Sequence, residues 1–136
     1  MPNPYLEESE DRSKLPPAIR AKAESLAPLF RNSMKMAVDA KLKFAFGTDA
    51  GVIPHGTNAR QFASLVKWGL SPAEAIRTAT VNAADLLGLD DRGVIASGKL
   101  ADLIAVPDNP LADIRILENV SFAAADGWEV VGELAF

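Results

Sequence analysis

The residues best suited to chemistry are a carboxylate and an imidazole that lie six positions apart. Asp49 is the centre of a Gly-Thr-Asp-Ala-Gly run at 47–51, and His55, the only histidine of the chain, follows within Pro-His-Gly. The glycines allow the backbone to turn sharply and to approach a ligand closely. From the residues alone, Asp49 could equally cap the next turn, and His55 could simply be solvated. Both are candidate site residues.

Two other motifs suggest chemistry that their surroundings do not support. The run 47–51 resembles a nucleophile elbow with Asp in place of Ser, but that mechanism needs a distant histidine, and the only histidine lies in the same loop. Gly93–Lys99 matches the start of a phosphate-binding loop, but Leu100 replaces the hydroxyl residue that would hold magnesium. A β-turn at 97–99 explains that motif without a nucleotide.

The element that would position Asp49 is a short apolar run at 42–47. It is bounded by glycine and is far too short for a helix, so we expect a strand. Strands that are apolar throughout are typically buried on both faces of a parallel sheet, and active sites lie at the carboxyl ends of such strands. No second run of this type occurs in the sequence. A lone buried strand indicates that the chain is part of something larger.

Helices are expected on both sides of this strand, because apolar residues recur at steps of three and four. One should span about 18–40, with a kink or a break at Pro28. Another should begin after Asn58 as its N-cap and end at Gly69.

A third helix and a strand-rich tail complete the predicted order of elements. Ser71–Glu74 has the pattern of a capping box, and the helix it begins should end at Gly88 with Leu87 in the core. Glycine, proline and Asp-Asn turns separate the short strands expected afterwards. These strands are 93–98, 101–106, 120–124 and 128–131, the last after a hairpin turn at 126–127. The tail is therefore predicted to be a small antiparallel β region.

Composition restricts the class of protein. The chain has 136 residues, of which 49% are apolar and 24% charged, and its formal charge is −4. This mild acidity argues against nucleic acid or an anionic membrane as a partner. The absence of cysteine excludes disulfides and thiolate metal sites. Neither a secretory signal nor a membrane-length apolar stretch is present, so we expect a cytoplasmic protein.

Taken together, five motifs resemble the C-terminal part of the metal-dependent amidohydrolase superfamily, in its imidazolonepropionase-like and Xaa-Pro dipeptidase-like branch. Each motif is weak alone, but five in this order are highly specific, and the resemblance extends from about residue 15 to 132. The motifs are 46–51, 54–56, 71–76, 79–88 and 93–106.

The resemblance implies an α/β fold, the C-terminal fragment of a (β/α)8 TIM barrel joined to strands of a small β-sandwich. Residues 1–90 would be the end of the barrel, with strand eight at about 42–47, and residues 91–136 would be C-terminal strands of the sandwich. The implied activity is hydrolysis of C–N bonds in peptide-like or cyclic amide substrates by a metal-activated water.

The resemblance also implies roles for the two candidate residues. Asp49 matches the aspartate after strand eight, which ligates a divalent metal, expected to be zinc, and accepts a proton from the attacking water. A cation keeps such a carboxylate ionised while making the water more acidic. His55 falls in the loop that lines the substrate pocket, where it would contact the substrate.

The remaining metal ligands of the family have no counterpart here. They are a His-x-His pair after strand one, a lysine or glutamate after strand four, and histidines after strands five and six. A full barrel takes about 250 residues. We therefore expect the isolated chain to bind no metal and to hydrolyse nothing. The alternatives are a subunit of a split enzyme that another chain completes, and a non-enzymatic module that covers its orphan strand by forming a homo-oligomer.

Overall fold

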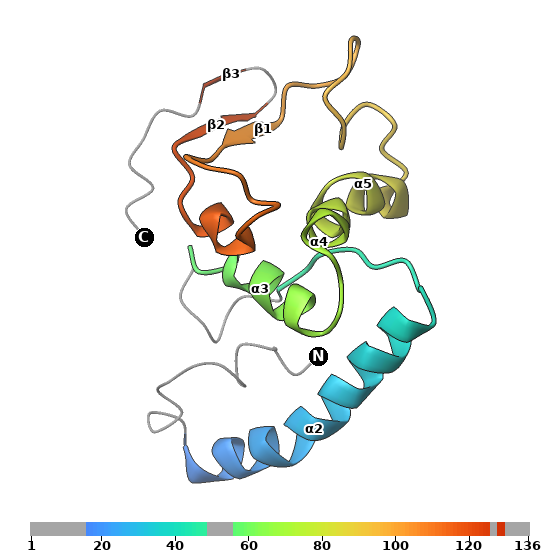
Figure 1. Cartoon of the computed structure of the whole chain (residues 1–136), viewed down its shortest axis with the longest axis vertical. Coiled ribbons are helices and arrows are strands. Elements are labelled where there is room, and N and C mark those ends of the chain that lie inside the picture. The colour runs from blue at the N-terminus through green and yellow to red at the C-terminus, as the bar shows by residue number, and fades with distance from the viewer. Residues whose placement is uncertain (1–15, 49–55, 126–127, 130–136) are drawn as a thin grey trace.

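The computed structural model describes residues 16–48, 56–125 and 128–129, the last two by backbone alone. A long helix lies on one side, short helices occupy the middle, and a small sheet lies at the far end (Figure 1). The helices are α2 (Pro17–Asp39), α3 (Arg60–Lys67), α4 (Pro72–Ala79), α5 (Val81–Leu87) and the 3-10 helix η2 (Ile114–Glu118). The strands are β1 (Leu103–Ala105), β2 (Phe122–Ala125) and β3 (Trp128–Glu129).

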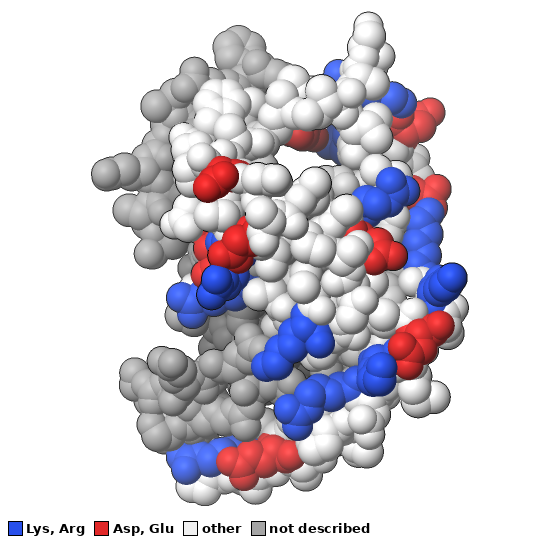
Figure 2. All heavy atoms as spheres, viewed as in Figure 1, with Lys and Arg blue, Asp and Glu red and all other residues white. Residues whose placement is uncertain are grey.

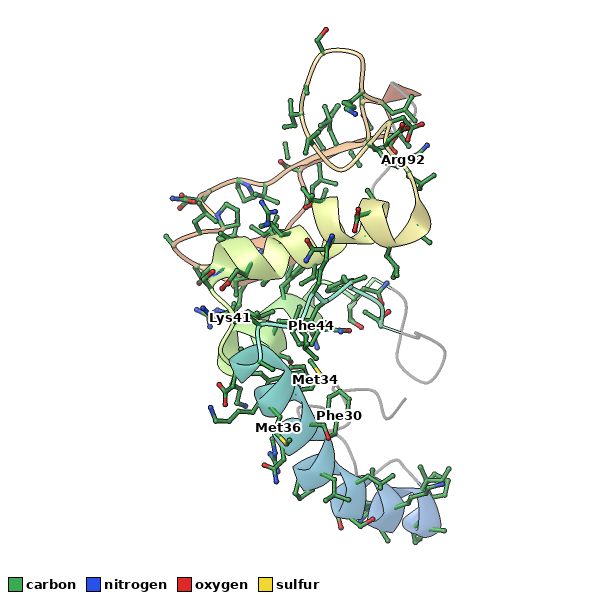
Figure 3. All side chains as sticks on the ribbon, turned by 90° about the vertical axis from the view of Figure 1, so that its right-hand side faces the viewer. Phe30, Met34, Met36, Lys41, Phe44 and Arg92 are labelled. Carbon is green, nitrogen blue, oxygen red and sulfur yellow. The ribbon has the colours of Figure 1, made fainter. Side chains whose placement is uncertain are left out.

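Helix α2 confirms the predicted helix at 18–40. Of the kink or break expected at Pro28, the break is absent. The helix continues through Pro28, because a proline removes only one backbone bond and the turns on either side remain intact. Phe30 and Met34 lie on one side of α2 and Met36 on the other (Figure 3). The Phe30 ring meets the edge of Trp68, with 5.5 Å between centroids, which joins α2 to the end of α3.

Across the described residues, no helix has the length and apolar character needed to cross a membrane.

The short helices show which local signals decide a helix end. The capping box at the start of α4 is confirmed, since Ser71 Oγ accepts from Glu74 N and Glu74 Oε2 accepts from Ser71 N. Gly69 ends α3 at a φ of +114°, as predicted. Asn58 is not the cap of α3, because no side chain caps that helix. The third predicted helix is in fact two helices, which break at Thr80 (φ −120°, ψ −99°).

Replacing Ser71 by alanine removes the side-chain acceptor of the α4 capping box. We expect the free energy of unfolding to fall by about 1 kcal/mol. Urea denaturation measures this loss. Ser33, exposed in the middle of α2, is the matched control, because its replacement by alanine removes no cap. Equal urea midpoints for the two variants would contradict the role given to the cap.

The sheet confirms the predicted antiparallel β region in a shorter form. The strand order is β1-β2-β3, with Leu103 opposite Ala124 and Ala125 opposite Trp128. The hairpin residues 126–127 lie outside the described part. The strand expected at 93–98 is wrong: the chain turns there, with a positive φ at both terminal glycines of that stretch.

The core lies mainly between the short helices. Its buried apolar side chains are Ala23, Leu65, Ala75, Ala84, Ile114 and Leu117. Leu87 is not among them, which corrects the expectation that it is a core residue. Its side chain is 69% exposed, because the inward side of the short helix α5 is the side that carries Ala84.

Candidate functional site

The segment that leads to Asp49 is held by helices and not by other strands. Residues 42–48 form no strand ladder within the described part of the chain, so the strand predicted at 42–47 is not formed here. Phe46 N donates to the carbonyl of Thr78 (2.8 Å), and Asn82 Nδ2 donates to the carbonyl of Phe44 (2.9 Å). A strand needs a neighbour to complete its ladder, and these two bonds satisfy only one side of the segment.

Side chains of this segment alternate between two environments. Phe44, Phe46 and Thr48 are half-buried, while Ala45 and Gly47 are exposed. The Phe46 ring stacks on Phe62 of α3, with 4.5 Å between centroids. The expectation that both faces are buried is therefore met on one face only. The alternation has the period of two that is characteristic of an extended chain.

A hydrogen bond between two side chains joins the ends of the loop that carries the candidate residues. Thr48 Oγ1 donates to Asn58 Oδ1 across 3.2 Å in a half-buried position. The residues between them, Asp49 and His55 included, lie outside the described part. The structure therefore places the stem of the loop and leaves the roles of both candidates as predictions.

Sequence reasoning missed two functions of asparagine in this region. Asn58 was predicted to be a helix cap, but its side chain accepts from Thr48 instead. Asn82 had no signal, since its partner, the carbonyl of Phe44, is 38 positions away in the sequence. Both asparagines position the segment that precedes Asp49.

Replacing Asn82 by alanine leaves the half-buried carbonyl of Phe44 without its side-chain donor. We expect a loss of about 1 kcal/mol in the free energy of unfolding relative to a matched control. The control is Asn32→Ala. Asn32 is exposed on α2, and both substitutions replace a helical asparagine by alanine, so both raise the helix propensity by the same amount. Thermal unfolding followed by circular dichroism measures the difference. If the two variants melt alike, the Asn82 bond contributes nothing.

The described residues do not make up a metal site. Throughout the described ranges, no group of three or more His, Cys, Asp or Glu side chains could hold a metal ion. A catalytic zinc takes about three protein ligands. A complete metal centre would need ligands beyond these residues.

A separate ionic cluster fixes the loop between α5 and the sheet. Arg92 donates from Nε to Asp91 (2.9 Å) and from Nη1 to Asp102 (3.1 Å), which is next to β1. The hydrogen bond from Arg92 holds the pKa of Asp91 below its usual value. These groups are already paired, so the cluster is structural.

Comparison with known proteins identifies the family. A sequence model of the amidohydrolase family matches residues 4–131, nearly the whole chain. The chain belongs to the amidohydrolase family. This amidohydrolase chain has a solved structural relative described as a Xaa-Pro dipeptidase with methionine bound in its active site. The two are 43% identical with a TM-score of 0.83, and the match covers 94% of this chain and 32% of the relative.

Curated relatives agree with this family assignment. The chain is 35% identical over 102 residues to ochratoxinase from Aspergillus niger. This alignment covers 73% of this chain and 21% of that protein. The chain is also 40% identical over 95 residues to imidazolonepropionase from Deinococcus deserti. That alignment covers 68% of this chain and 24% of the imidazolonepropionase. The amidohydrolase chain therefore spans about a quarter or less of these relatives. The predicted superfamily and branch are confirmed.

Proposed function

We propose that this amidohydrolase chain is the C-terminal part of a (β/α)8 barrel enzyme that hydrolyses C–N bonds in small amide or dipeptide-like substrates. The observation that carries the proposal is the match to about a third of a Xaa-Pro dipeptidase at a TM-score of 0.83. In this assignment, 42–47 is the eighth barrel strand, 1–90 completes the barrel, and 91–136 contributes strands to a β-sandwich.

The alternation of side chains along 42–48 supports this assignment. The half-buried side chains face the helices, as the outer face of a barrel strand does, and Ala45 and Gly47 lie on the other face. If the alternation continues for one more step, Asp49 shares the face of Gly47. In a barrel that face is the interior, and the carboxyl end of the strand is the mouth of the active site.

Exposed apolar side chains also support a larger assembly. Ile95 is 89% exposed and Leu86 is 73% exposed. Side chains this large and this exposed are available for contact with more protein. The rest of the barrel, carried by the same polypeptide or by a separate one, would cover them.

The two candidate residues receive different roles in the proposal. Asp49 would ligate a divalent metal, with zinc expected, and would accept a proton from the attacking water at a carboxylate oxygen. The metal would supply positive charge to the site, and its other ligands would come from the rest of the barrel. His55 would contact the substrate from the same loop.

A chimeric enzyme tests the proposal. Residues 4–131 of this chain would replace the matching segment of the Xaa-Pro dipeptidase. We expect the chimera to hydrolyse an Xaa-Pro dipeptide in the presence of zinc, with the unaltered dipeptidase as the reference. A folded, zinc-loaded chimera without turnover would overturn the assignment. The isolated chain, assayed in parallel, should show no hydrolysis.

A further inference from the structure

A cavity of about 370 Å³ lies at the start of the 42–48 segment, at the end opposite to the one that leads to Asp49. It is open to solvent on one side and is lined by the last turn of α2, the start of that segment, and α4. Lys41 and Phe44 lie beside the end of α2 (Figure 3). The lining residues used below are apolar (Val38, Leu42, Phe44 and Leu70) or charged (Lys41, Glu74 and Arg77).

Backbone hydrogen bonds hold the walls of this cavity. Lys41 N donates to Val38 O (2.8 Å), and Leu42 N donates to Ala37 O (3.0 Å), so the chain turns out of α2 in a defined path. Lys41 is in the left-handed region at a φ of +52°. The backbone walls of the cavity are thus preformed, so less entropy is lost in ordering the protein when a ligand binds.

The charges around the cavity are incompletely paired. Basic side chains outnumber acidic ones over the α2 side of the molecule (Figure 2). Lys41 and Arg77 have no ion pair within the described residues, whereas nearby Lys43 pairs with Asp85. The charge of Lys41 acts on Glu74 and helps to lower its pKa, and Arg77 adds a second cation at the same cavity. With two cations and one carboxylate, the cavity favours a ligand that carries an anionic group.

Glu74 contributes one available oxygen. Its Oε2 accepts from the backbone N and the hydroxyl of Ser71, while its Oε1 accepts nothing from the described part of the chain. The Ser71 hydrogen bonds hold the pKa of Glu74 below its usual value, so the carboxylate is charged at neutral pH. A simple anion would be repelled by Glu74, and a simple cation by Lys41 and Arg77.

We propose that this cavity binds a free α-amino acid with an apolar side chain. Arg77 and Lys41 would hold its carboxylate, Oε1 of Glu74 would accept from its ammonium group, and Leu42 and Leu70 would contact its side chain. A zwitterion carries an anionic group for the two basic side chains and a cationic group for Glu74. The exposed side chain of Leu42 provides apolar surface for the ligand's side chain. Pockets for small ligands begin at about 300 Å³, so the volume fits an amino acid and excludes a long peptide. The inference is independent of the proposed hydrolysis.

Titration of the full chain with L-leucine, followed by amide NMR shifts and calorimetry, tests the site. We expect saturable binding with shifts at Leu42 and Leu70. N-acetyl-L-leucine lacks the ammonium group and L-leucinamide lacks the carboxylate, so each should bind about tenfold more weakly or worse. Absence of saturable leucine binding would overturn the proposal. If N-acetyl-L-leucine or inorganic phosphate binds as tightly as leucine, the cavity is a simple anion site and the proposal is wrong.

Three variants separate the cavity from the general surface. Arg77→Gln and Glu74→Gln should each weaken leucine binding about tenfold or more. Glutamine at position 74 can keep the capping box, so α4 should remain folded. Lys35→Gln is the matched control, because Lys35 pairs with Asp39 on α2 and does not line the cavity. Equal leucine affinity in Arg77→Gln and Lys35→Gln would overturn the proposal, and the analogue titrations on the unaltered chain test it even if a variant unfolds.

Discussion

Asp49→Asn should abolish turnover in the chimeric dipeptidase, lowering kcat about 10²–10⁴-fold. Asparagine keeps the size of the side chain but cannot accept the proton, and it is a poorer ligand for a divalent cation. The residue is assigned to the mouth of a strand and not to the packed core, so the thermal midpoint should change little. Steady-state kinetics and a thermal melt of the same preparation measure both quantities.

Asp39→Asn is the matched control for this loss. Asp39 is an exposed carboxylate at the end of α2 that pairs with Lys35, and nothing assigns it to catalysis. Its replacement should leave kcat within about twofold, since exposed ion pairs contribute little. Near-normal turnover in Asp49→Asn would show that the role carried over from the family is wrong, even if the chimera itself is active.

Gly93→Ala should destabilise the isolated chain by about 2–4 kcal/mol. A Cβ at this position would lie 3.0 Å from the Cβ of Ala84 and 3.1 Å from the carbonyl oxygen of Thr80. The backbone φ of +87° is also unfavourable for a residue with a side chain. Each effect costs about 1–2 kcal/mol or more. Urea denaturation of wild type and variant measures the sum.

Gly98→Ala separates the two causes. Gly98 has a similar φ of +80°, but a Cβ there would meet nothing within 4 Å. We expect it to lose only about 1–2 kcal/mol, which is the conformational part. If both variants lose the same amount, close packing at Gly93 is unimportant and the fit between that loop and α5 is looser than the structure indicates.

Local signals in the sequence predicted local structure well. The capping box at Ser71–Glu74 and the turn at Gly69 involve residues within a few positions of each other, so their pattern is visible in the sequence. The strands at 103–105 and 122–125 were likewise indicated by the turns around them. The family motifs, which are short and ordered, predicted the superfamily.

Predictions that depended on distant partners could be checked only in part, and some were wrong. The run at 42–47 has the composition of a strand but forms no ladder among the described residues, because a strand needs neighbours and helices satisfy only one side of it. Its place as a barrel strand stays a proposal. Asn58 was available to cap α3, yet Thr48 competes for its side chain. Leu87 has the spacing of a core residue, but α5 is too short and too near the surface to bury it. The positions of Asp49 and His55 remain predictions.

The Arg92 cluster has a consequence for how the chain unfolds. One guanidinium contacts Asp91, just after the helices, and Asp102, just before the sheet. All three residues lie C-terminal to the boundary proposed at residue 90, so the cluster fastens the loop that follows this boundary. Gly93 in the same loop packs closely against Thr80 and Ala84 and so joins the loop to the helices. Helices and sheet should consequently lose their structure in one cooperative transition, and a protease should find few early cut sites at their junction.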